Sequence, residues 1–250
     1  TAADYKNLDT FETAALAKAD KVFAAKDYRA ATAEYDLFLV ENGRSSASAY
    51  ALLRKGRSQM LDNKRYEAVR TFKEVIDYFP DSVLYAAAAL YYQGQCHFEN
   101  GEQANAVKVW QKMVADAEYA KHTLAAPALL ALANELARQQ KTAEAASYYE
   151  QAAVEFRTKN PDVAREAIER ACEIHIRLLP SEKKMSAFYP RARTTRYHPD
   201  NAPDENKYWA DVRAMIRRFA AGFTAEEKSQ RAAYFKYWAD TMEGKRLADN

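Results

Sequence analysis

The chain has 250 residues, of which 48% are hydrophobic and 29% are charged, and its formal net charge is +2. A charge this small does not by itself indicate nucleic-acid binding, and the presence of only 6 glycines and 7 prolines argues against an all-β fold. No run of about 18 apolar residues occurs, so the sequence predicts no membrane-spanning helix.

Helical periodicity predicts successive pairs of helices joined by short polar turns. In chain order the pairs are 8–25 with 28–40, 48–62 with 65–79, two helices within 86–110, and 123–139 with 142–157. Gly43 should take the left-handed conformation at the end of the first pair, and Asp81 or Ser82 should cap the helix that follows. Asn160-Pro161 is a strong helix start and predicts a fifth first helix over 161–179.

Two independent marks repeat along these pairs at intervals of 37 to 39 residues. A small residue recurs in each first helix, at Ala19, Gly56, Gly94, Ala133 and Ala171. An alanine followed by an aromatic residue one turn later recurs in each second helix, as Ala31/Tyr35, Ala68/Phe72, Ala106/Trp110 and Ala145/Tyr149. Small residues let two helices approach closely and the ring fills the space beside them, which is typical of a tight antiparallel helix pair.

On these marks the chain resembles the tetratricopeptide repeat family over residues 11–180, although its repeats run about four residues longer and most of the family's tryptophans and prolines are missing. Phe79-Pro80 supplies the family's closing proline once. The resemblance implies an all-α, right-handed helical-repeat solenoid of four helix pairs of 37–39 residues plus a fifth helix. It also implies a non-enzymatic scaffold for protein–protein interaction.

In that family three positions of each first helix point into the concave groove. Carried over by repeat phase, the resemblance implies a protein-binding groove made of Leu16, Asp20, Phe23, Leu53, Arg57, Met60, Tyr91, Gln95, Phe98, Leu130 and Asn134, continued by Ala137, Ile168, Cys172 and His175. The lysine and asparagine pattern with which the family clamps C-terminal carboxylates is absent. A largely apolar and aromatic groove suits the burial of a partner helix or segment. The alternative is that several of these residues pack against neighbouring helices.

The C-terminal third differs in composition, which predicts a solenoid over 1–180, a basic proline-rich loop over 181–204 and a helical hairpin over 205–250. The hairpin helices, near 205–221 and 225–243, are expected to cap the open end of the solenoid. The loop interleaves aromatic residues with the basic contacts Lys183, Lys184, Arg191, Arg193 and Arg196. A solvated loop, an acidic protein surface, an anionic envelope polymer and single-stranded nucleic acid are all compatible with this pattern, and a protein surface is favoured over nucleic acid.

No catalytic motif, metal-ligand spacing or cofactor loop is recognisable. Cys172 and His175 share a helix face but have no further ligand or orienting acid, and Cys96 is interpreted as a buried apolar residue. The partner is therefore expected to be a protein, or copies of this chain assembling head to tail into oligomers or extracellular or envelope filaments. The start at Thr1 favours an extracytoplasmic protein from which a signal peptide has been removed.

Overall fold

The computed structural model describes residues 5–156, 159–160, 162–164, 166–167 and 170–171, and all elements within them are helices. The chain divides into two compact units, 1–140 and 141–250. The predicted basic loop over 181–204, the hairpin over 205–250 and the groove positions Ile168, Cys172 and His175 lie outside the described residues.

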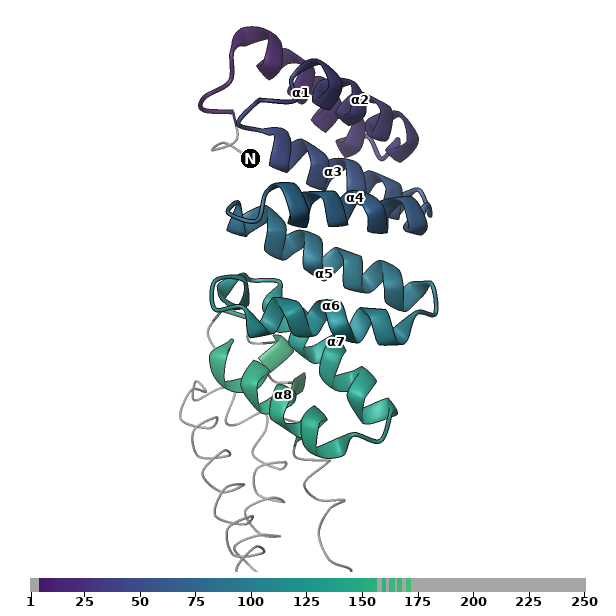
Figure 1. The fold of residues 1–250 in the computed structure, drawn as a ribbon, viewed down its shortest axis with the longest axis vertical. Coiled ribbons are helices and arrows are strands. Elements are labelled where there is room, and N and C mark those ends of the chain that lie inside the picture. The colour runs from purple at the N-terminus through teal and green to yellow at the C-terminus, as the bar shows by residue number, and fades with distance from the viewer. Residues whose placement is uncertain (1–4, 157–158, 161, 165, 168–169, 172–250) are drawn as a thin grey trace, which may run out of the picture. The chain divides into compact units, whose positions relative to one another are not determined.

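The first unit is a stack of helices in chain order, as Figure 1 shows. It contains α1 (Thr10–Ala24), α2 (Tyr28–Glu41), α3 (Ser48–Leu61), α4 (Arg65–Tyr78), α5 (Val83–Glu99), α6 (Gln103–Ala115), the short 3-10 helix η1 (Tyr119–Lys121) and α7 (Ala125–Arg138). Each helix packs against the next one along the chain. The predicted helical-repeat solenoid is therefore confirmed, with helix ends within a few residues of those predicted.

Close contacts inside the pairs follow the two repeated marks. A Cβ atom added to Gly94 would lie 2.2 Å from Nε1 of Trp110, and one added to Gly56 would lie 2.7 Å from Phe72. Ala19 and Tyr35 occupy the same two positions in the first pair and are both fully buried. The prediction that the small residue accommodates the ring of the second helix is thus confirmed for these pairs.

The turn inside each pair has one residue with a left-handed backbone, whereas the sequence analysis predicted this conformation at Gly43, after the first pair. Positive φ angles occur at Lys26, Asn63, Gly101 and Gln140, which follow each other at 37, 38 and 39 residues. Gly43 is not among them, so its predicted left-handed conformation is wrong. The repeat thus fixes the turn geometry even where the sequence supplies lysine or glutamine, which adopt it at a cost of about 1–2 kcal/mol.

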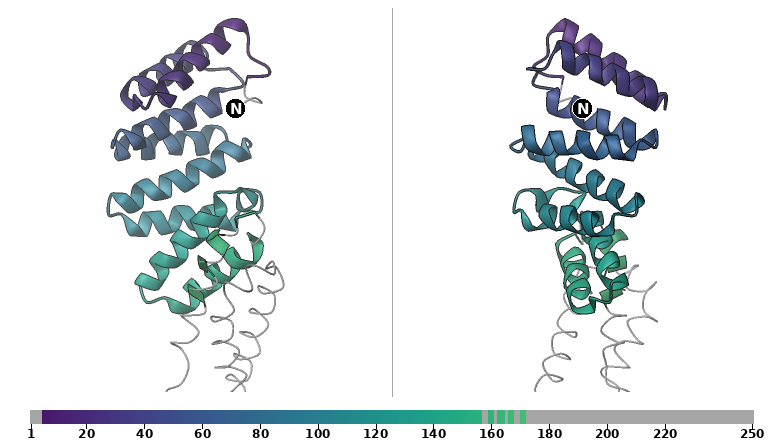
Figure 2. Two further views of the ribbon diagram at one scale, coloured as in Figure 1. Left: turned by 180° about the vertical axis from the view of Figure 1, so that it is seen from behind. Right: turned by 45° about the vertical axis from the view of Figure 1, so that its right-hand side comes forward.

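The first helices of the pairs form the inner layer of the first unit. Contacts join α3 to α5 and α5 to α7 across successive repeats, whereas α2, α4 and α6 are not in comparable contact with one another. We therefore call the side of the stack that α1, α3, α5 and α7 form its inner face. Figure 2 shows this part of the chain from two further directions.

The second unit begins with α8 (Thr142–Glu155). Beyond it, residues 162–164, 166–167 and 170–171 are helical, and Ala164, Ala167 and Ala171 are buried at the spacing of one helix face. This agrees with the start of the predicted helix over 161–179. In the part of the chain that the structure describes, no helix is both long and apolar enough to cross a bilayer.

Candidate functional site

A pocket of about 340 Å³ opens on the inner layer of the first unit. Its walls come from α1, α3, α5 and the segment after η1, so three successive repeats contribute to it. The lining residues are Asp20, Tyr50, Leu53, Arg54, Arg57, Leu84, Tyr85, Ala88, Tyr92 and His122.

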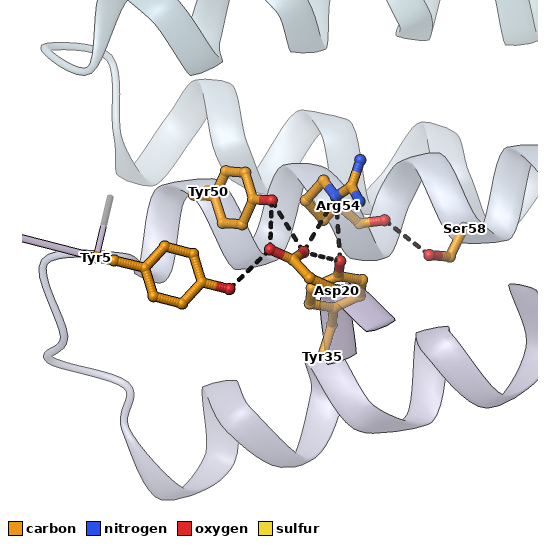
Figure 3. A network of polar contacts seen from close by, with 6 residues as sticks. All are labelled: Tyr5, Asp20, Tyr35, Tyr50, Arg54 and Ser58. Carbon is orange, nitrogen blue, oxygen red and sulfur yellow. Dashed lines mark hydrogen bonds and ion pairs between the residues drawn. The ribbon is translucent and has the colours of Figure 1, made fainter. Parts of the chain in front are cut away.

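The Asp20 carboxylate is the centre of a hydrogen-bond network beside this pocket (Figure 3). Its Oδ2 accepts from the Tyr5 hydroxyl at 2.8 Å, its Oδ1 accepts from the Tyr35 hydroxyl, and the Tyr50 hydroxyl lies 2.9 Å from both oxygens. These phenols come from the segment before α1, from α2 and from α3. One carboxylate therefore joins the first repeat to the second.

Arg54 completes this network from α3. Its Nε donates to the Tyr35 hydroxyl at 3.1 Å and lies 3.5 Å from Oδ1 of Asp20. Burial by itself lowers the pKa of Arg54, but the hydrogen bond to Tyr35 and the nearby Asp20 charge raise it above its ordinary value. Burial, together with the hydrogen bond to Asp20, raises the pKa of Tyr35, and burial likewise raises that of Tyr50. The cluster therefore holds one carboxylate, one guanidinium and neutral phenols at neutral pH.

Aromatic rings support the two arginines of the pocket. The Arg54 guanidinium lies 3.6 Å from the centre of the Phe23 ring. The Arg57 guanidinium lies 4.7 Å from the centre of the Tyr92 ring and 5.9 Å from that of Phe23. Tyr92 is in turn stacked on Phe72 of α4, with ring centres 5.8 Å apart. These cation–π contacts hold the guanidinium groups at the pocket wall without neutralising them.

His122 reaches the pocket because η1 is fixed to the preceding repeat. The Tyr119 hydroxyl donates to the carbonyl oxygen of Pro80 at 3.0 Å, at the turn between α4 and α5. Nδ1 of His122 accepts from the backbone N–H of Leu124 at 3.0 Å, so the ring proton is on Nε2. Burial lowers the pKa of His122, which keeps the ring neutral.

Three of the residues predicted to line the groove, Asp20, Leu53 and Arg57, line this pocket. Phe23 lies beside it under the two guanidinium groups. Leu16 was also predicted to line the groove, but its side chain is fully buried between helices and offers no surface to a partner.

The other predicted residues lie apart from the pocket lining. Tyr91 and Gln95 are half-buried and paired, with the Gln95 Nε2 donating to the Tyr91 hydroxyl at 2.8 Å. Phe98 is exposed and its ring centre lies 6.1 Å from that of Trp110. Met60 and Leu130 are half-buried and Asn134 is exposed.

Repeat phase alone missed most of the pocket, including Tyr50, Arg54, Tyr85, Tyr92 and His122. A signal was present for four of them. Tyr50, Arg54 and Arg57 are spaced as one face of α3, and Tyr85 and Tyr92 as one face of α5. His122 follows a 3-10 turn that carries no periodicity, so no comparable signal exists for it.

Other reactive groups in the described residues show no arrangement for chemistry. Burial raises the pKa of the free Cys96 thiol to about 12, so the thiol is protonated at neutral pH. His97 is paired with Glu102 through Nδ1 at 2.5 Å. Within the described part of the chain, no group of three or more histidine, cysteine or acidic side chains is placed to hold a metal ion.

Comparison with known proteins finds a similarity in two of the repeats. Residues 50–82 and 88–117 match the model of a protein family described as the tetratricopeptide repeat. The first match spans most of α3 and α4, and the second spans most of α5 and α6. No curated protein matches the chain.

Proposed function

We propose that this chain, which carries tetratricopeptide repeats, is a non-enzymatic scaffold that binds a segment of a partner protein on the inner face formed by α1, α3 and α5. Repeats of this family generally mediate protein–protein interaction. The observation that supports a site on this face is the pocket, because it is concave and draws its walls from three successive repeats.

The composition of the pocket favours a protein as the ligand. Tyrosine and arginine dominate the residues that contribute most of the binding energy in protein interfaces, and both types line it. The Asp20 network and the Tyr92–Phe72 stack fix several of these side chains before binding. Side chains that are already ordered lose less entropy when a partner binds.

The remaining groove residues of α5 and α7 stay a prediction that extends this face. Phe98 is 45% exposed and Leu130 and Gln95 are partly accessible, so a segment leaving the pocket has further side chains to contact. This extension is proposed as the path of the partner beyond the pocket.

A display library of random peptides, selected on the full chain, tests the proposal. Leu84 is 58% exposed at the pocket, so Leu84→Arg should leave folding intact while blocking the site. Tyr78→Arg is the matched control, because Tyr78 is also exposed but lies on α4 of the outer layer. Selected peptides should lose about tenfold or more in affinity with the first variant and remain unchanged with the control. Equal binding to all three proteins would place the partner site elsewhere.

Self-assembly remains the second candidate. At the first repeat, Phe11 is 85% and Val40 is 77% exposed, and the end of a repeat array lacks a neighbour to cover its apolar residues. A contact of this end with the other end of a second copy would be heterologous and would form rings or filaments. Neutralising Arg191, Arg193 and Arg196 together should then shorten such polymers. A chain that stays monomeric in light scattering at high concentration and low salt would end this alternative.

A further inference from the structure

The pocket contains more positive charge than its own acid can neutralise. Asp20 is the acidic residue in its lining, and Arg54 and Arg57 are the basic ones, while His122 is neutral. One carboxylate against two guanidinium groups leaves one net positive charge in a concave, partly apolar site.

The hydrogen bonds of the Asp20 carboxylate are made within the protein. Its two oxygens already accept from Tyr5, Tyr35 and Tyr50 and lie beside Arg54. Three phenol hydroxyls thus donate to a group with about four lone-pair positions, the Tyr50 hydroxyl being shared between both oxygens, and the Arg54 charge lies beside them. The acid is therefore a structural group of the network and does not face a ligand as a free charge.

Donors, in contrast, remain available on both arginines. In the part of the chain that the structure describes, the Arg57 guanidinium has aromatic contacts but neither an ion pair nor a hydrogen bond. Arg54 uses Nε, and its two terminal nitrogens make no hydrogen bond to any described residue. The Nε2–H of His122 adds a neutral donor, since Nδ1 is the atom held by Leu124.

We propose that this pocket binds the carboxylate of a glutamate or aspartate side chain within the partner segment, held by Arg57 with Arg54 and His122 beside it. The inference rests on the proposed function and names the group that the partner presents. A carboxylate carries the single negative charge that balances the site, and its two oxygens match the planar fork of a guanidinium. A phosphoryl group carries up to two charges and would leave an excess negative charge in the pocket.

A side chain fits the site better than a chain terminus does. The apolar wall of Leu53, Leu84 and Ala88 lies in the same pocket, so the residues on either side of the acid have a surface to contact. The predicted continuation of this face along α5 includes Gln95 and Phe98, which are accessible to solvent. A segment that crosses several repeats presents side chains to the pocket, while its terminus lies outside the pocket.

The test uses a display library whose random segment is embedded between folded carrier domains, so that no free terminus is offered. Selection on the full chain should enrich glutamate or aspartate at one position next to apolar residues. Synthetic peptides of the strongest sequence, with the acid or its amide counterpart, are then titrated by calorimetry. Changing the acid to its amide should weaken binding by about tenfold to hundredfold, as for loss of a charged hydrogen bond.

Variants of the protein, combined with the two peptides, complete a double-mutant cycle between the arginine and the acid. Arg57→Gln should lower the affinity for the acidic peptide by about tenfold or more, to that measured for the amide peptide. Arg57→Lys should recover part of the loss, because it restores the charge without the planar fork. Arg70→Gln is the matched control, since Arg70 is an exposed arginine of α4.

The outcomes separate the inference from the proposed function. Peptides that bind the face, lose affinity with Leu84→Arg and show no preference for an acid would overturn the carboxylate site and leave the scaffold proposal standing. The carboxylate site would also be overturned if a free C-terminal carboxyl group increased the affinity of a peptide that lacks the acidic side chain. Tighter binding of a phosphoserine peptide than of the acidic peptide would overturn it as well. A library that yields no peptide sensitive to Leu84→Arg would refute both.

Discussion

Replacing Gly94 by alanine separates two physical effects of opposite sign. Helix propensity alone favours the change by about 1 kcal/mol, because alanine replaces a glycine in the interior of α5. Packing opposes it, because the new Cβ would lie 2.2 Å from Nε1 and 2.5 Å from Cδ1 of Trp110. Restoring ordinary contact requires the ring or the helix to move by about 1 Å, and Trp110 is only 2% exposed.

The size of the net effect follows from these contacts. Overpacking a dense core costs about 1–3 kcal/mol, and displacing the ring also weakens the hydrogen bond that Trp110 Nε1 donates to the Tyr91 carbonyl oxygen, worth about 1 kcal/mol. Subtracting the propensity gain leaves a destabilisation of about 1–3 kcal/mol. Urea unfolding followed by circular dichroism measures it.

A second substitution identifies the cause. Trp110→Phe removes much of the ring that the new methyl group would meet. The double variant should therefore lose less unfolding free energy than the sum of the two single losses, by about 0.5–3 kcal/mol. Gly56→Ala should be destabilising by a smaller amount, because its nearest contact is 2.7 Å from Phe72. A Gly94→Ala protein at least as stable as the parent, with additive effects in the double variant, would refute the proposed packing.

Further predictions concern the turn, the Asp20 network and the first repeat. Gly101→Ala should lower the free energy of unfolding by about 1–2 kcal/mol although its Cβ would meet nothing within 4 Å, because φ is +80°, and no change in urea unfolding would contradict this. Asp20→Asn should lower it by about 2–3 kcal/mol, whereas Asp36→Asn, which removes a surface ion pair to lysine, should change it by less than about 1 kcal/mol. Because the pKa of Tyr50 is raised in the folded state, its phenol stays protonated where the unfolded chain ionises, so the contribution of Tyr50 to stability should be constant below about pH 10 and fall above it. Tyr50→Phe should reduce that slope by about 1.4 kcal/mol per pH unit, which urea unfolding at a series of alkaline pH values measures. Phe11→Ser should abolish any concentration-dependent association in light scattering, and persistence of association would exclude the first repeat as the contact.

The repeat architecture was predictable because its determinants are local and recur. The pairs Gly56/Phe72 and Gly94/Trp110 are each 16 residues apart in sequence, and their sizes match across one helix contact. Short-range matching of this kind can be recognised from spacing alone. The capping prediction was right in position, since Ser82 is the cap residue of α5, but the Ser82 side chain makes no capping hydrogen bond there.

The residues predicted for the groove differ in exposure, because phase within one helix does not define exposure. The first of the three family positions is fully buried as Leu16 and nearly buried as Leu53, whereas the equivalent Tyr91 is half-buried. The second position is accessible at Asp20 and at Arg57. Burial depends on which neighbouring helices cover that side, and a single helix pattern does not contain this information.

The pocket itself required three helices to be placed relative to one another. The Asp20 carboxylate meets Tyr35 at a separation of 15 residues and Tyr50 at 30, so the network forms only when α1, α2 and α3 are packed. Once it forms, the Asp20 carboxylate is hydrogen-bonded inside the protein, and Arg57 is an arginine of the pocket with no acidic partner among the described residues. Asp20 therefore has a role that the sequence analysis did not suggest, because it stabilises the contact between the first two repeats. We propose that recognition of the partner depends instead on Arg57 of α3.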